Sequence, residues 1–390
     1  MQWMVPQNKL DEHQQDILRK CKAGDRPAEW IQGFAGSGKT VLAVHLAQQL
    51  HETNPDLSIC VAVYTHALKD LIDSGLEERF SGEIPVITYH KFLSNRQHYD
   101  LVIVDEVQDI GPVDLQRIKN LSGRLVVAGD SDQSIYAQGA SPGDIDRVLA
   151  PRIHRLGVIY RLTKRIIQIV KSILPDSQIE GELTGRMQDV QVTLAKADST
   201  EQEVDWVWRN AKQRARVGDP SAILLPSHSV VRTFIDTICR LEQKASPEFR
   251  QYCQPNGRPG RGTDYGHINE TLRAYGLPLQ YTGNSFGSLR DSDTRALTYL
   301  MTYHSAKGLD FDSVFLPHLN QHISFWRDNP DIDRRLFFVG ATRSRKNLYL
   351  THTSALPHPY VQAMPQDLLH KQMCAPTTRA DAAPADDFSF

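Results

Sequence analysis

The chain alternates short apolar runs with stretches of helical pattern throughout most of its length. Six of the apolar runs predict strands, at residues 57–64, 100–104, 124–128, 222–226, 313–317 and 347–351. Their nearly continuous Val, Ile and Leu content is typical of strands that are buried on both faces. Leu42, Leu46 and Leu50 recur at four-residue spacing and predict a helix with one apolar stripe. This alternation predicts an α/β protein with parallel sheets.

The strand and helix pattern also suggests where domains begin and end. A first set of strands and helices ends around residues 150–162 and a second set begins there, so we predict one domain at 1–155 and another at 156–355. Residues 254–266, rich in Gly and Pro, are expected to form an exposed loop. Residues 356–390 are expected to be a C-terminal extension, disordered from about residue 375, where Ala, Pro and Asp repeat.

Composition excludes several classes of protein. No apolar run approaches the ~18 residues that a membrane-spanning helix needs, and residues 1–6 lack the basic start and apolar core of a signal peptide. The five cysteines form no C-x-x-C pair, so we expect neither a zinc site nor a disulfide framework, but free thiols in the cytoplasm. The formal net charge of −2 means that a nucleic-acid site would have to be a local basic patch.

A phosphate-binding loop is the first chemical signal. Residues 33–40 read GFAGSGKT and match the pattern G-x-x-x-x-G-K-[ST] in full. In such a loop, glycines let backbone N–H groups point at phosphates, and the N-terminus of the next helix assists them. The lysine reaches the β- and γ-phosphates and the hydroxyl that follows binds Mg²⁺. The sequence therefore predicts ATP and Mg²⁺ as cofactors, bound through Gly33, Ala35, Gly36, Ser37, Gly38, Lys39 and Thr40.

An acidic pair follows a buried strand in the same half of the chain. Asp105 and Glu106 come directly after the apolar run at 100–104. A carboxylate at the end of a strand beside a phosphate loop suits Mg²⁺, and we assign Asp105 this role together with Thr40. Glu106 is placed to orient or deprotonate the attacking water. The pair predicts ATP hydrolysis and not only nucleotide binding.

The series of motifs over most of residues 10–351 resembles the UvrD/Rep/PcrA group of superfamily 1 helicases. Residues 10–14 resemble the family's adenine-reading glutamine motif, which implicates Gln14. Residues 105–109 match its D-E-x-Q-D box. Residues 129–136 are similar to G-D-x-x-Q-S-I-Y, whose glutamine, Gln133 here, couples the γ-phosphate to nucleic acid. The resemblance implies two RecA-like lobes with parallel sheets and an ATP site in the cleft between them.

The second half of the chain carries the remaining motifs of this series. Tyr160 and Arg161 resemble the N-Y-R motif, in which tyrosine stacks on adenine and arginine contacts the γ-phosphate, although Ile159 replaces the usual Asn. Residues 302–311 resemble T-x-H-x-A-K-G-L-E-F, which implies that Gly308 and Asp310 bind the nucleotide, Asp310 through its ribose. Residues 334–343 match the last helicase motif, with Arg343 as arginine finger. A guanidinium supplied by a separate lobe would make hydrolysis depend on closure of the two lobes.

Contacts to the nucleic acid follow from the resemblance alone. Residues 64–66 resemble the segment that touches single strands, and residues 88–90 resemble the T-F-H element. Each tyrosine in these segments could equally be a core residue. After Tyr136, residues 137–140 (AQGA) replace the arginine and stacking aromatic of larger helicases, which suggests a weaker grip. The predicted contacts are Tyr64, Thr65, His66, Thr88, Tyr89, His90, Thr302 and His304.

A second basic feature is left open by the sequence. Arg250, Arg258 and Arg261 fall in or next to the Gly- and Pro-rich loop. They could contact phosphates or form an ordinary solvated loop.

Larger members of the family carry accessory domains at two places where this chain has little room. Eleven residues, 93–103, separate Phe92 from Val104, and residues 281–284 run almost straight into the strand leading to Thr302. A folded core needs at least ~40 residues, so we expect the two lobes alone. The predicted function is ATP-driven translocation on single-stranded DNA, 3′→5′ as the resemblance implies, with duplex unwinding. A nucleic-acid-stimulated ATPase switch or loading subunit, for example in anti-phage defence, is the alternative, an RNA helicase stays open, and a protein partner could supply duplex grip or nuclease activity.

Overall fold

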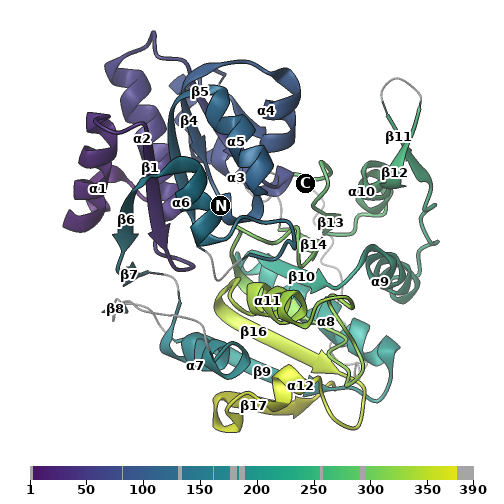
Figure 1. Ribbon diagram of the computed structural model, residues 1–390. Coiled ribbons are helices and arrows are strands. Elements are labelled where there is room, and N and C mark those ends of the chain that lie inside the picture. The colour runs from purple at the N-terminus through teal and green to yellow at the C-terminus, as the bar shows by residue number, and fades with distance from the viewer. Residues whose placement is uncertain are drawn as a thin grey trace, which may run out of the picture.

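The computed structural model describes residues 3–80, 82–130, 134–160, 162–175, 182–183, 189–254, 258–289 and 296–375. Within these residues the chain forms two α/β lobes, each built on a sheet in which every strand pair is parallel (Figure 1). The α/β class with parallel sheets is therefore confirmed. The expected disorder beyond residue 375 concerns residues 376–390, which lie outside the described part of the chain.

The first lobe contains a sheet of six strands. Their spatial order is β3 (Val86–Thr88), β2 (Ile59–Val63), β4 (Tyr99–Val104), β5 (Ser122–Gly129), β1 (Ala28–Gly33) and β6 (Arg152–Leu156). The helices of this lobe are α1 (Glu12–Ala23), which precedes β1, and the connecting helices α2 (Lys39–Thr53), α3 (His66–Gly75), α4 (Tyr89–Asn95), α5 (Pro112–Asn120) and α6 (Pro142–Leu149). The helices α1 to α3 pack on one face and α4 to α6 on the other. Neighbouring strand residues point to opposite faces, so Ile31 faces the first set of helices and Trp30 the second.

The second lobe contains a sheet of seven strands. Their order is β13 (Leu279–Tyr281), β14 (Thr298–Thr302), β10 (Ser221–Leu225), β15 (Phe311–Leu316), β16 (Ser344–His352), β9 (Gln191–Lys196) and β17 (Leu369–Met373). The helices of this lobe are α7 (Lys164–Ile173), α8 (Thr200–Arg216), α9 (His228–Leu241), α10 (Tyr265–Ala274), α11 (Pro330–Ala341) and α12 (Pro359–Gln362). A separate antiparallel hairpin, β11 (Gln251–Cys253) and β12 (Pro259–Thr263), and a short pair, β7 (Val158–Ile159) and β8 (Glu182–Leu183), lie outside both sheets.

The C-terminal limit of the second lobe differs from the expected one. The sequence pattern placed that limit at residue 355, but β17 pairs with β9 and forms an edge of the second sheet. The second lobe therefore extends at least to Met373. The reason is that β17 (LHKQM) has only two apolar residues and four of its five positions are exposed, so it carries no buried-strand signal.

Local sequence explains where the helices begin. Asp11, Ser141, Ser199 and Ser227 each accept a hydrogen bond from a backbone N–H of the helix that follows, as N-cap residues of α1, α6, α8 and α9. Gly24 ends α1 in the left-handed conformation, with φ of 71°. Each of these caps depends only on residues close to it in the sequence, and it determines where a helix starts or ends. The candidate site lies at turns of this kind, where a strand is followed by a helix.

The two lobes share one continuous apolar core. Side chains of α1 to α3 from the first lobe and of α7 and α11 from the second belong to the same buried cluster. Phe34 and Phe338 meet edge to face across the junction, with ring centroids 6.1 Å apart. Among the described residues, no helix is both long enough and apolar enough to cross a lipid bilayer.

Candidate nucleotide and nucleic-acid site

The phosphate loop connects β1 to α2 at the inner side of the first lobe. Gly36 and Gly38 have φ of 77° and 93°, which only glycine adopts readily. A Cβ on Gly38 would lie 2.7 Å from the Nε2 of Gln14, so the close approach of α1 also requires glycine here. The Lys39 ammonium donates to the carbonyls of Gly33 (2.7 Å) and Phe34 (3.1 Å). The loop is thus preformed, and its lysine is held at the centre by groups that a phosphate could replace.

Two carboxylates follow β4 and face this loop. Asp105 is fully buried, and its Oδ2 accepts a hydrogen bond of 2.6 Å from the Thr40 hydroxyl. Burial and the neighbouring Glu106 carboxylate raise the pKa of Asp105 to about 6. A carboxylate and a hydroxyl at this separation are oxygen ligands of the kind that Mg²⁺ prefers. The predicted pair of metal ligands therefore lies together, as oxygen donors that fit the ion.

Glu106 is held in an unusual backbone conformation. Its φ of 56° and ψ of 45° lie in the left-handed region, which is uncommon for residues other than glycine and is often found at functional sites. Gln108 donates its side-chain amide to the Glu106 carboxylate, and the other end of that amide accepts from the backbone N–H of Asp130 (3.1 Å). Burial opposes ionisation of Glu106, but the ammonium groups of Lys307 and Lys39 bring its pKa below the usual value. Glu106 is therefore an oriented, ionised carboxylate.

Lys307 of the second lobe lies beside two carboxylates of the first lobe, those of Glu106 and Asp109. Its side chain is only 2% exposed, and its ammonium donates to Oδ2 of Asp109 (2.6 Å) and lies 3.7 Å from Oε2 of Glu106. A second contact between the lobes runs from the Arg335 guanidinium to the carbonyl of Ser134 (3.1 Å). The carboxylate predicted to handle water thus lies beside a charged junction between the lobes.

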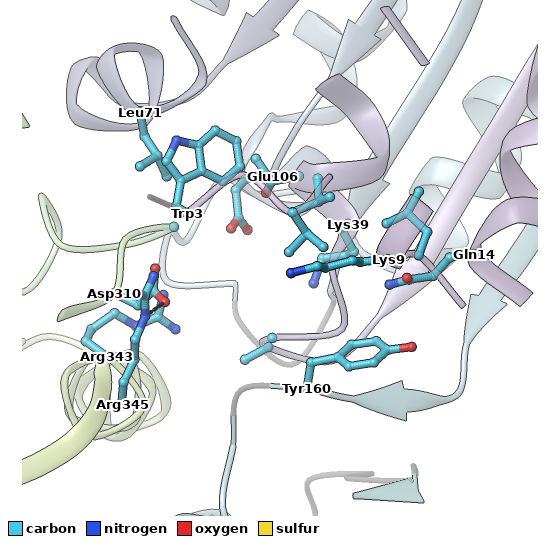
Figure 2. A pocket seen from close by; sticks show the side chains of 18 residues that line it. Trp3, Lys9, Gln14, Lys39, Leu71, Glu106, Tyr160, Asp310, Arg343 and Arg345 are labelled. Carbon is cyan, nitrogen blue, oxygen red and sulfur yellow. Dashed lines mark hydrogen bonds and ion pairs between the residues drawn. The ribbon is translucent and has the colours of Figure 1, made fainter. Parts of the chain in front are cut away.

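A cavity of about 370 Å³ lies between the two lobes at this point. Figure 2 shows Gln14, Lys39 and Tyr160 on one side and Arg343, Arg345 and Asp310 on the other. The sequence-predicted residues that line it are Gln14, Ala35, Gly36, Gly38, Lys39, Thr40, Glu106, Tyr160, Gly308, Asp310 and Arg343. Gly33, Ser37 and Asp105 do not line the cavity, but each belongs to or contacts the loop that does. The phosphate loop at 33–40 and the segment at 334–343 are about 300 residues apart in the sequence, and residues of both line the same cavity.

The side chains of the second lobe are engaged within their own lobe. Arg343 is 1% exposed, and its guanidinium donates to the carbonyls of Val339 (2.9 Å) and Leu309 (3.1 Å) and to the Thr342 hydroxyl (2.9 Å). Asp310, expected at the ribose, forms an ion pair with Arg345. Both side chains border the cavity, but each would have to exchange these partners to contact a nucleotide.

At the opposite end of the cavity, Gln14 and Tyr160 flank the loop. The Gln14 side-chain amide donates to the carbonyl of Ser37 (3.2 Å), and its oxygen accepts from the N–H of Asp11 (3.2 Å) in a capping box. The backbone N–H of Tyr160 donates to the carbonyl of Gly36 (3.0 Å). The Tyr160 hydroxyl is buried without a hydrogen-bond partner in the described part of the chain. Buried polar groups are normally paired, so this end of the cavity suits a ligand with polar edges, such as a nucleotide base.

Most of the predicted aromatic contacts to nucleic acid form one row across both lobes. Tyr64 stacks on Tyr136, with ring centroids 4.3 Å apart, and lies 5.2 Å from Tyr89. His304 of the second lobe lies 5.8 Å from Tyr136 and 5.5 Å from Trp326. Tyr89 is 4% exposed and belongs to the core, whereas Trp326 is 39% exposed. Trp326 is therefore an accessible aromatic surface that motif reasoning missed.

The three threonines in these motifs have local structural partners. Thr65 and Thr88 accept hydrogen bonds from the N–H groups of Leu68 (3.1 Å) and Lys91 (3.4 Å), as N-caps of α3 and α4. Thr302 is buried, and its hydroxyl donates to that of Ser305 (3.0 Å). They fix the turns on which the neighbouring histidines are carried.

The histidines differ in their surroundings. His66 and His90 are exposed, each at or near the start of its helix. Burial, with the nearby Lys307 and His228, lowers the pKa of His304 to about 4. His304 is therefore neutral at physiological pH and can both donate and accept a hydrogen bond.

Gln133 and Arg161 lie outside the described residues, so their positions are not placed. Lys307 is a residue of the matched A-K-G segment, and Arg345 follows Arg343 by two positions, so closer attention to charge in these motifs could have found both. The remaining unpredicted residues of the cavity wall are Trp3, Val5, Lys9, Leu10, Val41 and Leu71, of which Leu10 alone belongs to a matched motif, the segment at 10–14.

Both halves of the chain match models of known families. Residues 282–355 match the UvrD-like helicase C-terminal domain, and residues 9–189 match an AAA domain. The ATP-dependent DNA helicase Rep of Buchnera aphidicola subsp. Schizaphis graminum is 48% identical over 58 residues, which cover 14% of this chain and 9% of that protein. The ATP-dependent DNA helicase PcrA of Staphylococcus epidermidis is 32% identical over 97 residues, which cover 20% of this chain and 13% of that protein.

These matches are short compared with the proteins that carry them. The chain spans 9–13% of the length of these two curated relatives. Among solved structures, the PRRSV helicase has a TM-score of 0.44 and 15% identity, covering 90% of this chain and 56% of that chain.

Proposed function

Because the chain belongs to the UvrD-like helicases of superfamily 1, we propose that it hydrolyses ATP to move along single-stranded DNA in the 3′→5′ direction. The single observation that carries this proposal is the cavity between the lobes. One wall provides Lys39 and Glu106, and the other provides Arg343. A site divided in this way can hydrolyse only when the lobes are together, which links chemistry to movement. The expected division into lobes at residues 155 and 156 is part of the same proposal, with Leu156, the last residue of β6, kept in the first lobe.

The residues of the first lobe would bind MgATP and activate the attacking water. Bound MgATP would supply the phosphoryl group and the free energy of its hydrolysis. Lys39 would exchange its two loop carbonyls for the β- and γ-phosphates, and Thr40 and Asp105 would hold Mg²⁺. Glu106 would accept a proton from the attacking water, which its ionised state permits. Gln14 would read the base, and Tyr160, which follows the proposed boundary between the lobes, would stack on it.

The second lobe would complete the site on closure. Arg343 would turn from the carbonyls of its own lobe to the γ-phosphate, and Asp310 would exchange Arg345 for the ribose. We assign Arg161 to the γ-phosphate and Gln133 to its coupling with the DNA strand. Trp326 and the exposed His66 and His90 would contact the strand, with Trp326 as a stacking surface for a base.

The expected strength of unwinding follows from the lengths of two connections. Three residues, 96–98, join α4 to β4, and residues 282–297 join β13 to β14. Neither connection has room for a duplex-holding domain of ~40 residues. We therefore expect weak strand separation by the chain alone, restored by a partner that grips duplex. This feature also favours the second candidate, a DNA-stimulated ATPase that serves as a switch or loading subunit.

The direct test is ATPase activity with and without single-stranded DNA or RNA. DNA should stimulate turnover more than RNA, since the relatives are named DNA helicases. Lys39→Ala should abolish productive ATP binding, whereas Glu106→Gln should keep binding and reduce hydrolysis by about 10²- to 10⁴-fold. Lys22→Ala, an exposed lysine of α1, is the matched control and should be unchanged. Hydrolysis by Glu106→Gln near the wild-type rate would mean that Glu106 is wrongly assigned. Stimulation of the ATPase by RNA and not by DNA would mean that the nucleic-acid substrate is RNA.

Strand displacement on a duplex with a single-stranded tail separates the two candidate functions. A translocating motor should displace short duplexes from a 3′ tail and not from a 5′ tail. A switch should show stimulated ATPase activity and no displacement from either. The free state of all five cysteines supports a reducing compartment, and we include a cytoplasmic location in the proposal.

A further inference from the structure

The β11–β12 hairpin has no part in the site described above. It lies at the outer edge of the second lobe, next to α10 and apart from the second sheet (Figure 1). A groove of about 650 Å³ runs between the hairpin, α9, α10 and the turn at residues 284–286. That volume is within the range of sites that hold a nucleotide-sized ligand.

Aromatic rings line this groove. The Tyr252 ring meets Phe286 edge to face, with centroids 5.3 Å apart, and Phe286 lies 6.1 Å from Tyr265. A Cβ on Gly260 would lie 2.5 Å from the Tyr252 ring, so glycine on the facing strand is required for the ring to lie where it does. Phe286 is fixed by a tight turn in which it exchanges two backbone hydrogen bonds with Gly283 (2.9 and 3.0 Å). Tyr252 and Phe286 are both partly exposed, so rings with fixed positions remain accessible.

Positive charge lies beside these rings. Arg232 of α9 and Arg250 at the base of the hairpin are both exposed and line the groove. Arg250 donates to Asp264 (3.0 Å), the acidic residue that caps α10 by accepting from the N–H of His267 (3.1 Å). Arg232 makes no hydrogen bond or ion pair with the residues that the structure describes. Arginines beside partly exposed aromatic rings are the combination that binds single-stranded nucleic acid, because guanidinium groups pair with phosphates and rings stack on bases.

The groove lies next to the space between the lobes. A smaller cavity of about 140 Å³ lies between α3 and the same turn, and its first-lobe lining includes His66, Lys69 and Asp70. Ser285 and Phe286 line both the cavity and the groove. His66 belongs to the segment expected to touch the strand. A strand in contact with His66 could therefore pass over Phe286 to Tyr252 without leaving the surface.

We propose that this groove binds the nucleotides of single-stranded DNA that extend beyond the two-lobe site, with bases on Tyr252 and Phe286 and phosphates on Arg232 and Arg250. The site rests on the proposed function, because it extends the track of the same strand. It would give the second lobe a hold on DNA outside the space between the lobes. Such a hold would offset the missing arginine and aromatic after Tyr136.

The test is equilibrium binding of single-stranded DNA oligonucleotides of about 4 and about 16 nucleotides, the range of site sizes in strand-binding folds. Tyr252→Ala should weaken binding of the longer oligonucleotide by about 5- to 150-fold, the range that corresponds to one lost stacked base. Binding of the shorter one, which we assign to the contacts between the lobes, should be unchanged. Tyr252→Phe keeps the ring and should bind like the wild type.

Salt dependence tests the phosphate contact separately. Arg232→Ala should reduce the slope of log K against log salt by about 0.7, the value for one phosphate contact on a single strand, whereas Arg232→Lys should keep the slope. A merely structural role would not change this slope. At saturating DNA, the ATPase rate of each variant should equal that of the wild type.

Several results would overturn the proposal. The wild type could bind DNA normally while Tyr252→Ala and Arg232→Ala show the same affinity and the same salt slope. That result would mean that the groove does not bind the DNA strand and would point to a protein partner as its occupant. Equal losses for both oligonucleotides would mean that the variants damage the two-lobe site instead. If the wild type bound neither oligonucleotide, the proposed function itself would fail, and this site with it.

Discussion

The ion pair between Lys307 and Asp109 gives the sharpest test of how the lobes act together. Both side chains are buried, and they come from different lobes. Lys307→Met keeps the length of the side chain and removes its charge, which leaves Asp109 buried without its partner. Loss of one partner of a buried pair costs about 3–5 kcal/mol. Because this pair forms only where the lobes meet, we assign that cost to closure, which would then be disfavoured by roughly two to four orders of magnitude.

The same change should alter the acid–base behaviour of Glu106. Burial opposes the ionisation of this carboxylate, and Lys307 is the first of the charges that bring its pKa below the usual value. Without Lys307 the pKa of Glu106 should rise. A base with a higher pKa is protonated sooner as pH falls, so the acidic limb of the pH–rate profile should move to higher pH.

The assay is DNA-stimulated ATPase activity over a pH series, with two comparison variants. Lys307→Met/Asp109→Asn removes both charges and should recover part of the lost rate, since no unpaired charge is left buried. Lys346→Met makes the same change at a lysine that is 56% exposed and paired on the surface, and such pairs contribute about 0–1 kcal/mol. Activity losses that simply add in the double variant, together with an unmoved acidic limb, would refute the reasoning.

Three further predictions concern residues of the same cavity. Because the pKa of Asp105 is raised to about 6 and the metal needs the ionised carboxylate, Mg²⁺-dependent nucleotide affinity should fall as pH drops through about 6. Titrations of nucleotide affinity with Mg²⁺ measure this fall, and binding of ADP without Mg²⁺ is the control. Arg343→Lys keeps the charge but loses the planar fork, so kcat should fall toward about 10³-fold with ADP affinity unchanged, and an equal loss of ADP affinity would instead indicate a structural role. Tyr160→Phe removes a buried hydroxyl that lacks a partner among the described residues, so the free energy of unfolding in urea should stay level or rise by up to about 1 kcal/mol; a clear decrease would show that the hydroxyl is satisfied.

Much of the fold was predictable because its signals are local. The six apolar runs overlap β2, β4, β5, β10, β15 and β16, since a strand buried on both faces must be apolar at nearly every position. Leu42, Leu46 and Leu50 are buried along α2, as their spacing predicts. The loop before α2 needed glycines at positions that a pattern can specify, and Asp105 needed only to follow a buried strand. Each of these signals depends on residues within one turn or strand of one another.

Only the tertiary structure decided which distant residues meet. Lys307 lies 198 positions after Asp109, and no local pattern pairs them. The folded chain also directs Arg343 to carbonyls of its own lobe, pairs Asp310 with Arg345, places Trp326 beside His304, and adds β17 to the second sheet. Propensity, capping and burial pattern are set by neighbours in the chain, so the sequence by itself determines elements and motifs. Which side chains share a buried junction depends on how complete lobes pack, because a buried charge accepts whichever partner that packing brings within hydrogen-bond distance.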